Sequence, residues 1–237
     1  MFTLPDPASF QVLETTVYTP RQGIFLLGRH LQRIGDSARM LSAAYGRPVF
    51  SCHQISAESV AASVYHQISD RNLPYRVRML LSHNGQLDIQ AALEPPTARM
   101  PLVLDCQPTD TDSVFVRCKT THRPMYAAAV QRAVQRGAPK GALVLMFNQL
   151  NQITESNIAN VAVSVPDEQT GELALVTPPL SCGLLAGTMR QHLLDSGRIR
   201  EGIVTVDQYR RAAANGWPVV CMNSVRGEFE VDPVDCA

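Results

Sequence analysis

The chain has 237 residues, and its formal net charge is zero because 21 basic residues balance 21 acidic ones. Apolar residues make up 45% of the sequence, enough for a chain of this length to bury a substantial core. The lack of a basic surplus argues against a nucleic-acid partner. No apolar run approaches the roughly 20 residues of a transmembrane helix, and the N-terminus lacks a signal-peptide pattern. We therefore expect a globular cytoplasmic protein with neither a membrane nor a nucleic-acid partner.

The cysteines and histidines give no sign of a metal site. The six cysteines, none in a CxxC pair, are Cys52, Cys106, Cys118, Cys182, Cys221 and Cys236. Such wide spacing favours reduced thiols over a disulfide framework or a zinc site. None of the six histidines stands at a metal-ligand spacing with an acidic neighbour. We expect no bound metal.

The first part of the chain mixes strand and helix patterns. A period of about 3.6 residues between Gly28 and Gly46 predicts an amphipathic helix. The tripeptide His83-Asn84-Gly85 predicts a tight hairpin turn. In chain order, we expect strands at 10–18 and 24–27, helices at 28–46 and 57–69, and strands at 75–82, 86–93 and 101–106.

A polar, turn-rich segment at 107–113 is the predicted domain boundary. Beyond it, Pro124 suits the first turn of a helix that Gly137 ends. In chain order, we expect a strand at 113–118, a helix at 124–137, a strand at 142–147 buried on both faces, strands at 158–165 and 173–180, helices at 187–196 and 207–214, and a last core strand at 217–224. The mixture predicts an α+β protein with a small N-terminal lobe at 1–109 and a larger lobe at 110–237.

Common catalytic signatures are absent from the sequence. There is no GxxxxGK[ST] phosphate loop, no GxGxxG after a predicted strand and no GxSxG elbow. Nucleotide binding and the common serine-hydrolase arrangement therefore have no support.

Five other segments carry unusual combinations of polar and small residues. They are HLQRIGDSA (30–38), KTTHRPMY (119–126), ITESNIANV (153–161), TPPLSCGLLAGTMRQHLL (177–194) and MNSVRG (222–227). In this order they resemble the class IV aminotransferase family of fold type IV pyridoxal 5'-phosphate (PLP) enzymes, and within it the 4-amino-4-deoxychorismate lyases. The resemblance implies a two-lobed fold like that of D-amino acid aminotransferase with PLP between the lobes, a homodimer and a small-molecule substrate.

Only two lysines, Lys119 and Lys140, offer the primary amine that PLP chemistry requires. Such an amine must be unprotonated to react, and partial burial or a nearby cation favours that form. We expect Lys119 at the end of an apolar strand, facing a cleft, and Lys140 in an exposed loop. The alternative for Lys119 is a side chain that extends into solvent. The resemblance makes Lys119 the Schiff-base lysine and the proton-transfer base.

The resemblance also assigns the rest of the cofactor site. Glu155 is placed beside the pyridine nitrogen, where a carboxylate keeps that nitrogen protonated; the alternative is a capping role in a turn-prone run. Arg33 is placed on the phosphate, with an ion pair to Asp36 as the alternative. The remaining phosphate ligands are expected at a helix start and in the C-terminal loop: Thr188, Met189 and Ser224. Asn160 is expected to be structural.

The substrate contacts are the least specified part of the pattern. Arg123 and Tyr126 match the lyase-type motif, and Arg226 is a weaker candidate; Tyr126 could equally be the first core residue of its helix. The implied reaction releases pyruvate from aminodeoxychorismate and leaves p-aminobenzoate, a precursor in folate synthesis. Two alternatives remain: a class IV aminotransferase acting on D- or branched-chain amino acids, and a PLP-binding relative without activity.

Overall fold

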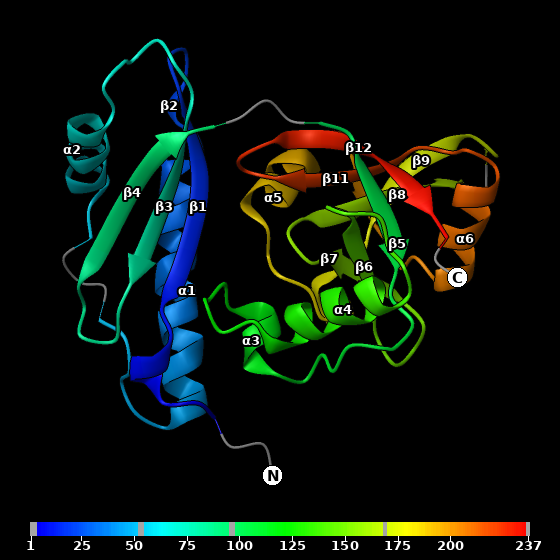
Figure 1. The fold of residues 1–237 in the computed structure, drawn as a ribbon, viewed down its shortest axis with the longest axis horizontal. Coiled ribbons are helices and arrows are strands. Elements are labelled where there is room, and N and C mark those ends of the chain that lie inside the picture. The colour runs from blue at the N-terminus through cyan, green and yellow to red at the C-terminus, as the bar shows by residue number, and fades with distance from the viewer. Residues whose placement is uncertain (1–3, 52–54, 95–97, 168–169, 236–237) are drawn as a thin grey trace. The chain divides into compact units, whose positions relative to one another are not determined.

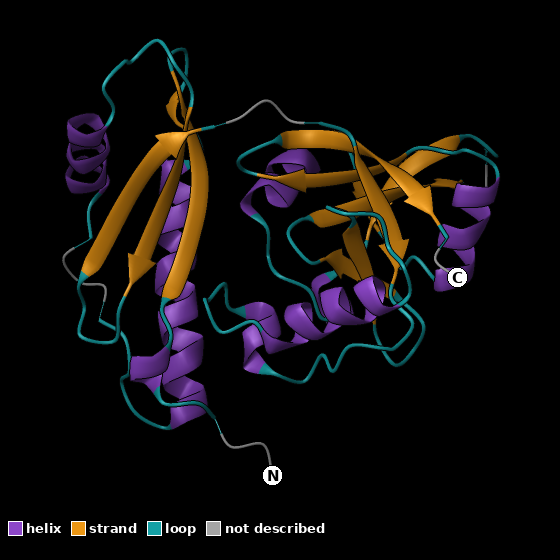
Figure 2. Ribbon diagram, viewed as in Figure 1, coloured by secondary structure: helices purple, strands orange, loops and turns teal. Residues whose placement is uncertain are grey.

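The computed structural model describes residues 4–51, 55–94, 98–167 and 170–235 (Figures 1 and 2). The chain forms two compact units: Met1–Pro96 with Arg117–Arg123, and Thr97–Val116 with Pro124–Ala237. This grouping differs from a single boundary at 109/110, because one strand before residue 109 pairs within the second unit and a short segment after 110 pairs within the first. No helix in the described part of the chain is long and apolar enough to cross a bilayer.

The first unit is built on a four-stranded antiparallel sheet in the order β2-β1-β3-β4 (Figure 1). Its strands are β1 (Val12–Thr19), β2 (Gly23–Ile24), β3 (Tyr75–Leu81) and β4 (Leu87–Leu93), and a 3-10 turn at Pro7–Ser9 precedes them. Helix α1 (Leu27–Tyr45) packs along β1, and α2 (Ala57–Gln67) packs against β4. The predicted helices and hairpin of this unit are confirmed.

Local chemistry explains where these helices begin and end. Apolar residues one turn apart on α1 are buried, among them Ile34 and Leu41. The helix ends at Gly46, whose φ of +64° suits a residue without a Cβ, and whose N–H donates to the carbonyls of the last turn. Helix α2 begins with a capping box in which Ser56 and Ser59 exchange side-chain and backbone hydrogen bonds.

The segment 117–123 belongs to the first unit because it pairs with the start of β1. The N–H of Leu13 donates to the carbonyl of Lys119 at 2.8 Å, and the N–H of Thr121 donates to the carbonyl of Gln11 at 2.9 Å. The Thr121 hydroxyl also accepts from the Gln11 N–H at 2.9 Å. These bonds fix the backbone on both sides of Lys119.

The second unit contains an eight-stranded mixed sheet in the order β10-β9-β8-β11-β12-β5-β6-β7. The strands are β5 (Met100–Leu104), β6 (Leu143–Phe147), β7 (Ile153–Ser156), β8 (Asn160–Pro166), β9 (Leu173–Thr177), β10 (Arg200–Glu201), β11 (Val219–Asn223) and β12 (Gly227–Val234). The helices are α3 (Val114–Arg117), α4 (Pro124–Gln135), α5 (Thr188–Asp195) and α6 (Val206–Ala214), with a 3-10 turn at Leu180–Cys182.

This sheet is strongly curled. Strand β7 lies at one end of the sheet, yet only residues 157–159 separate it from β8, which lies near the other end. The turn is closed by a hydrogen bond from the Ser156 N–H to the Ala159 carbonyl at 2.8 Å. The curl therefore brings β7 and β8 together around one core.

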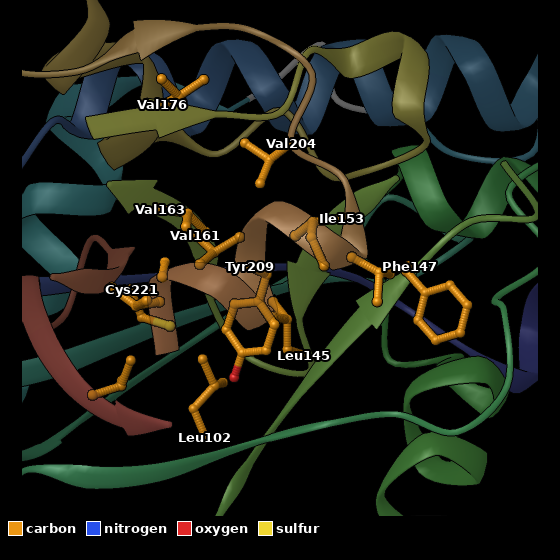
Figure 3. Close-up of a cluster of buried hydrophobic side chains, with 14 of the residues drawn as sticks. Leu102, Leu145, Phe147, Ile153, Val161, Val163, Val176, Val204, Tyr209 and Cys221 are labelled. Carbon is orange, nitrogen blue, oxygen red and sulfur yellow. The ribbon is translucent and has the colours of Figure 1, made fainter. Parts of the chain in front are cut away.

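That core is lined by side chains from most of the strands and from α6. Figure 3 shows Leu102, Leu145, Phe147, Ile153, Val161, Val163, Val176, Val204, Tyr209 and Cys221 in this cluster. On the opposite face of β6, Val144 and Met146 pack with Ala129 and Ala133 of α4. Strand β6 is buried throughout, which confirms the prediction of a strand covered on both faces.

Two sequence-based assignments are wrong, and the alternative that placed Glu155 in a turn is excluded. Residues 114–117 form a single helical turn rather than a strand; the Ser113 hydroxyl accepts from the Phe115 N–H and starts the turn, although the β-branched valines favour a strand. Glu155 lies in a strand, β7, because pairing with β6 prevails over the turn-forming tendency of its polar neighbours. The core does not end at residue 224, since β12 follows and pairs with both β11 and β5.

Candidate active site

Two buried hydroxyl groups meet at the start of α5. The side-chain oxygens of Thr188 and Ser224 lie 2.5 Å apart, and both residues are buried. Thr188 opens α5, whose N-cap, Gly187, provides no side-chain cap, and Ser224 directly follows β11. A helix start offers unsatisfied N–H donors and the positive end of the helix dipole, which together suit an anion. The structure thus brings the side chains of Thr188 and Ser224 together, and Met189 is the second residue of the same helix.

The loop that leads into α5 is held by close packing at two glycines. Gly183 has φ of +87°, and a Cβ there would lie 2.2 Å from the Cβ of Thr111. A Cβ on Gly187 would lie 1.8 Å from Oδ1 of Asn160. Neither position has room for a side chain, so the path of the backbone from 183 to 187 is tightly defined.

A buried carboxylate, that of Glu155, lies in the same unit. Glu155 is 4% exposed, and its Oε1 accepts from the Tyr126 hydroxyl at 2.7 Å while its Oε2 accepts from Nδ2 of Asn160 at 3.1 Å. Asn160 also donates to the Leu185 carbonyl at 3.0 Å. The expected structural role of Asn160 therefore has a concrete form: it connects Glu155 to the loop before α5.

The first unit carries the lysine and the arginine of the predicted site. Lys119 is half-buried and follows α3 and Cys118, while Lys140 is exposed in a turn as expected. Burial is the main cause that lowers the pKa of His30, and the positive charge of Lys119 is among the further causes. Lys119 therefore lies close enough to α1 for its charge to act there.

Arg33 is held by a buried carboxylate that the sequence did not single out. Its Nε and Nη2 donate to the two carboxylate oxygens of Glu14 at 2.7 and 2.6 Å, and Nδ1 of His30 lies 2.6 Å from Glu14 Oε2. Burial alone would raise the pKa of Glu14, but Arg33 and His30 lower it to about 2. Asp36, the partner considered from the sequence, pairs with Arg39 instead. A lone glutamate in a predicted apolar strand was the available signal for this cluster.

The candidates for substrate contact have different surroundings. Tyr126 contacts Glu155, and its ring packs against the cluster on α4 and β6. Arg226 contacts the Met100 sulfur, and its guanidinium carbon lies over the ring of Phe229, 5.7 Å from the ring centroid. Arg123 is half-buried at the end of the segment that pairs with β1.

Metal-binding clusters of His, Cys, Asp or Glu do not occur among the described residues. Within that part of the chain, Cys106, Cys118, Cys182 and Cys221 are free thiols. Cys52 and Cys236 lie outside the described residues.

Comparison with known proteins identifies the family. The family model for amino-transferase class IV matches residues 11–232. The chain is a class IV aminotransferase family member. It is 32% identical over 222 residues to the "Putative aminodeoxychorismate lyase" of Schizosaccharomyces pombe, a match that covers 91% of this chain and 86% of that protein. The predicted α+β, fold type IV architecture is confirmed by the solved structures that this family member resembles.

Two of those structures give the extent of the likeness. The crystal structure of a "Putative amino-acid aminotransferase" from Mesorhizobium loti superimposes with a TM-score of 0.75 at 28% identity, covering 95% of this chain and all of that one. A hypothetical aminotransferase from Mycobacterium tuberculosis, in its alpha-ketoglutarate and PMP bound form, superimposes with a TM-score of 0.70 at 17% identity. The match covers 94% of this chain and 81% of the M. tuberculosis chain.

The residues present fit a PLP cofactor. PLP needs an amine, a carboxylate for its ring nitrogen and donors for its phosphate. The chain offers Lys119 in the first unit and, in the second, the buried Glu155 and the hydroxyl pair at the start of α5, where no side chain caps the helix. The donor set therefore agrees with the chemistry of the group.

Proposed function

We propose that the chain is a PLP-dependent 4-amino-4-deoxychorismate lyase that releases pyruvate and p-aminobenzoate for folate synthesis. The observation that carries the proposal is the buried Glu155 carboxylate with its two donors, in the same unit as the Thr188–Ser224 hydroxyl pair. The choice of lyase is supported by the S. pombe relative, which bears the lyase name and matches nearly the whole chain.

When bound, PLP supplies an electron sink for the pair of electrons that a substrate carbon keeps as it loses its proton. In this proposal Glu155 holds the ring nitrogen in its protonated form, and Thr188, Met189, Ser224 and Arg33 hold the phosphate. Glu14 would fix the guanidinium plane of Arg33, since it already accepts from two of its nitrogens.

Lys119 has two roles in the proposed reaction. Its amine would hold the cofactor and, once free of it, would take the proton from the amine-bearing ring carbon of the substrate. The enolpyruvyl group would leave with the electron pair of its carbon–oxygen bond, take up a proton and become pyruvate. The ring becomes aromatic in this step, which drives the reaction forward. Arg123 and Arg226 are the proposed cations for substrate carboxylates, because a guanidinium can donate two parallel hydrogen bonds to a carboxylate.

A direct assay decides between the lyase and its alternatives. The purified protein, loaded with PLP, is incubated with aminodeoxychorismate while p-aminobenzoate is followed by fluorescence and pyruvate by a coupled assay. Both products should appear in equal amounts. A parallel incubation supplies D- or branched-chain amino acids with a 2-oxo acid.

Amino-group exchange without an aromatic product would replace the lyase by an aminotransferase, the function that the name of the M. loti structure suggests for that protein. Cofactor binding with neither reaction would favour a PLP-binding relative without activity.

We also propose that the protein is a homodimer in the cytoplasm, as the family resemblance implies. Analytical ultracentrifugation of the PLP-loaded protein should give twice the chain mass of 26.0 kDa. A single species at the monomer mass would contradict the dimer.

A further inference from the structure

The carboxylate of Glu155 is held from two sides. Oε1 accepts from the hydroxyl of Tyr126 on α4, and Oε2 accepts from the amide of Asn160 at the start of β8. A carboxylate on a single-bonded stem rotates unless both oxygens are engaged. With a donor on each oxygen, the plane of the Glu155 carboxylate is fixed, and a carboxylate oxygen can accept more than one hydrogen bond.

Tyr126 is well suited to hold this position. Its ring packs against the cluster formed by α4 and β6, so the hydroxyl is presented from a constrained side chain. Phenylalanine would preserve this packing and remove only the donor. The ring and the hydroxyl of Tyr126 therefore have separable roles.

Asn160 connects the carboxylate to the phosphate end of the proposed site. The two hydrogens of its amide nitrogen are used by Glu155 Oε2 and the Leu185 carbonyl. Its Oδ1 lies so close to Gly187 that a Cβ there would come within 1.8 Å. One side chain thus fixes Glu155 and the loop that leads to α5.

We propose that Tyr126 and Asn160 are positioning residues for Glu155, which hold its carboxylate in the orientation and the ionised state that the pyridine nitrogen of PLP requires. Tyr126 thereby acts through Glu155 and not on the substrate. The inference rests on the proposed function, because it assumes that Glu155 binds the ring nitrogen.

Without either donor, the Glu155 carboxylate turns more freely and becomes the better proton acceptor of the pair that it forms with the ring nitrogen. The proton then moves from the nitrogen toward Glu155, and the electron-withdrawing power of the ring declines. The effect belongs to the chemical step, so kcat should fall while KM stays within about twofold.

The test uses PLP labelled with ¹⁵N at the ring nitrogen, bound to the full chain. The nitrogen chemical shift reports protonation independently of activity. In the wild type we expect the chemical shift of a protonated ring nitrogen. In Tyr126→Phe and in Asn160→Ala the signal should move toward the unprotonated position, with kcat reduced on the order of 10- to 100-fold. Glu155→Gln removes the carboxylate itself and should therefore give the largest change in the nitrogen chemical shift.

Tyr45→Phe is the matched control. It also removes a tyrosine hydroxyl, but that hydroxyl donates to the carbonyl of Pro5 in the first unit. Its nitrogen shift and kcat should equal those of the wild type. If Asn160→Ala fails to fold because its loop contact is lost, Tyr126→Phe still decides the question, since its ring packing is retained.

A Tyr126→Phe variant with an unchanged nitrogen shift would overturn the inference, and a raised KM in that variant would instead assign Tyr126 to the substrate. These outcomes leave the proposed function intact, because the wild type would still bind PLP and form p-aminobenzoate. A wild-type chain that binds no PLP would overturn both.

Discussion

At the scale of single residues, the proposed chemistry depends on one amine. The sequence contains only Lys119 and Lys140, and the structure separates them clearly: Lys119 is half-buried beside the start of β1, and Lys140 is exposed in a turn of the second unit. The backbone on both sides of Lys119 is fixed by hydrogen bonds to β1. Its position is therefore defined by the sheet rather than by a mobile loop.

The first prediction concerns the two lysines. Lys119→Ala should abolish the visible absorbance of bound PLP and reduce the turnover of aminodeoxychorismate by at least about 1000-fold, because both the cofactor linkage and the proton acceptor are lost. Lys140→Ala should retain both properties. The measurement is a visible spectrum before and after borohydride reduction, with the reduced adduct located by peptide mass mapping.

An adduct on Lys140, or equal losses in the two variants, would mean that the assignment to Lys119 is wrong. Circular dichroism spectra of the two variants should match that of the wild type, so that a folding defect is recognised.

At the scale of elements, the segment 183–188 illustrates how small residues define a site. Gly183 and Gly187 are each approached by another side chain, and the segment ends in an uncapped helix start. The backbone of Gly187 has φ of −68° and ψ of 131°, a conformation that any residue can adopt. Only the proximity of Asn160 requires a glycine there.

The second prediction follows from this distinction. Gly187→Ala should destabilise the protein by about 1–3 kcal/mol, because the new Cβ displaces Asn160 or the loop. Backbone entropy alone would favour alanine by about 0.4–1 kcal/mol. Urea unfolding measures whether the free energy of unfolding falls or rises in the variant. Gly35→Ala in α1 is the matched control and should stabilise, since its Cβ would meet only the end of Arg39 at 3.7 Å.

A double-mutant cycle identifies the cause. In an Asn160→Ala background the clash partner is gone, so Gly187→Ala should lose most of its cost there. Equal destabilisation in both backgrounds would show that Asn160 is not the obstacle.

At the scale of the whole molecule, stability in acid depends on the buried cluster of Glu14, His30 and Arg33. The pKa of Glu14 is about 2 in the folded state, against an ordinary value of 4.5. A depressed carboxyl pKa stabilises the fold above the unfolded-state pKa, and this contribution is lost as the pH falls from 4.5 toward 2. It amounts to about 3 kcal/mol at most. His30, with a lowered pKa, adds a loss that begins below pH 6.5.

The third prediction is that the free energy of unfolding of Glu14→Gln depends less steeply on pH between pH 5 and pH 2 than that of the wild type, because the variant lacks this carboxylate. The variant is also less stable at neutral pH, because Arg33 is left buried without this partner. Urea midpoints measured across the range report the slope, and the exposed Glu172→Gln serves as control. A slope identical to that of the wild type would contradict the role given to Glu14.

The sequence alone predicted most elements of both units and the members of the proposed site. Hydrophobic periodicity identified α1, β6 and the β3–β4 hairpin, because these elements bury a regular face. It failed at 114–117 and at 153–156, where neighbours distant in sequence decide the local conformation. Strand β7 forms where it pairs with β6, a separate segment of the chain.

The sequence by itself determined the family, the fold class and the scarcity of lysine, since composition, periodicity and motif order are properties of the chain alone. The tertiary structure decided which partner each polar side chain has: Glu14 for Arg33, and Tyr126 and Asn160 for Glu155. These partners lie between 5 and 29 positions apart along the chain, and no local pattern encodes such distances. Buried polar groups must be paired, and only the folded chain shows with which groups they pair.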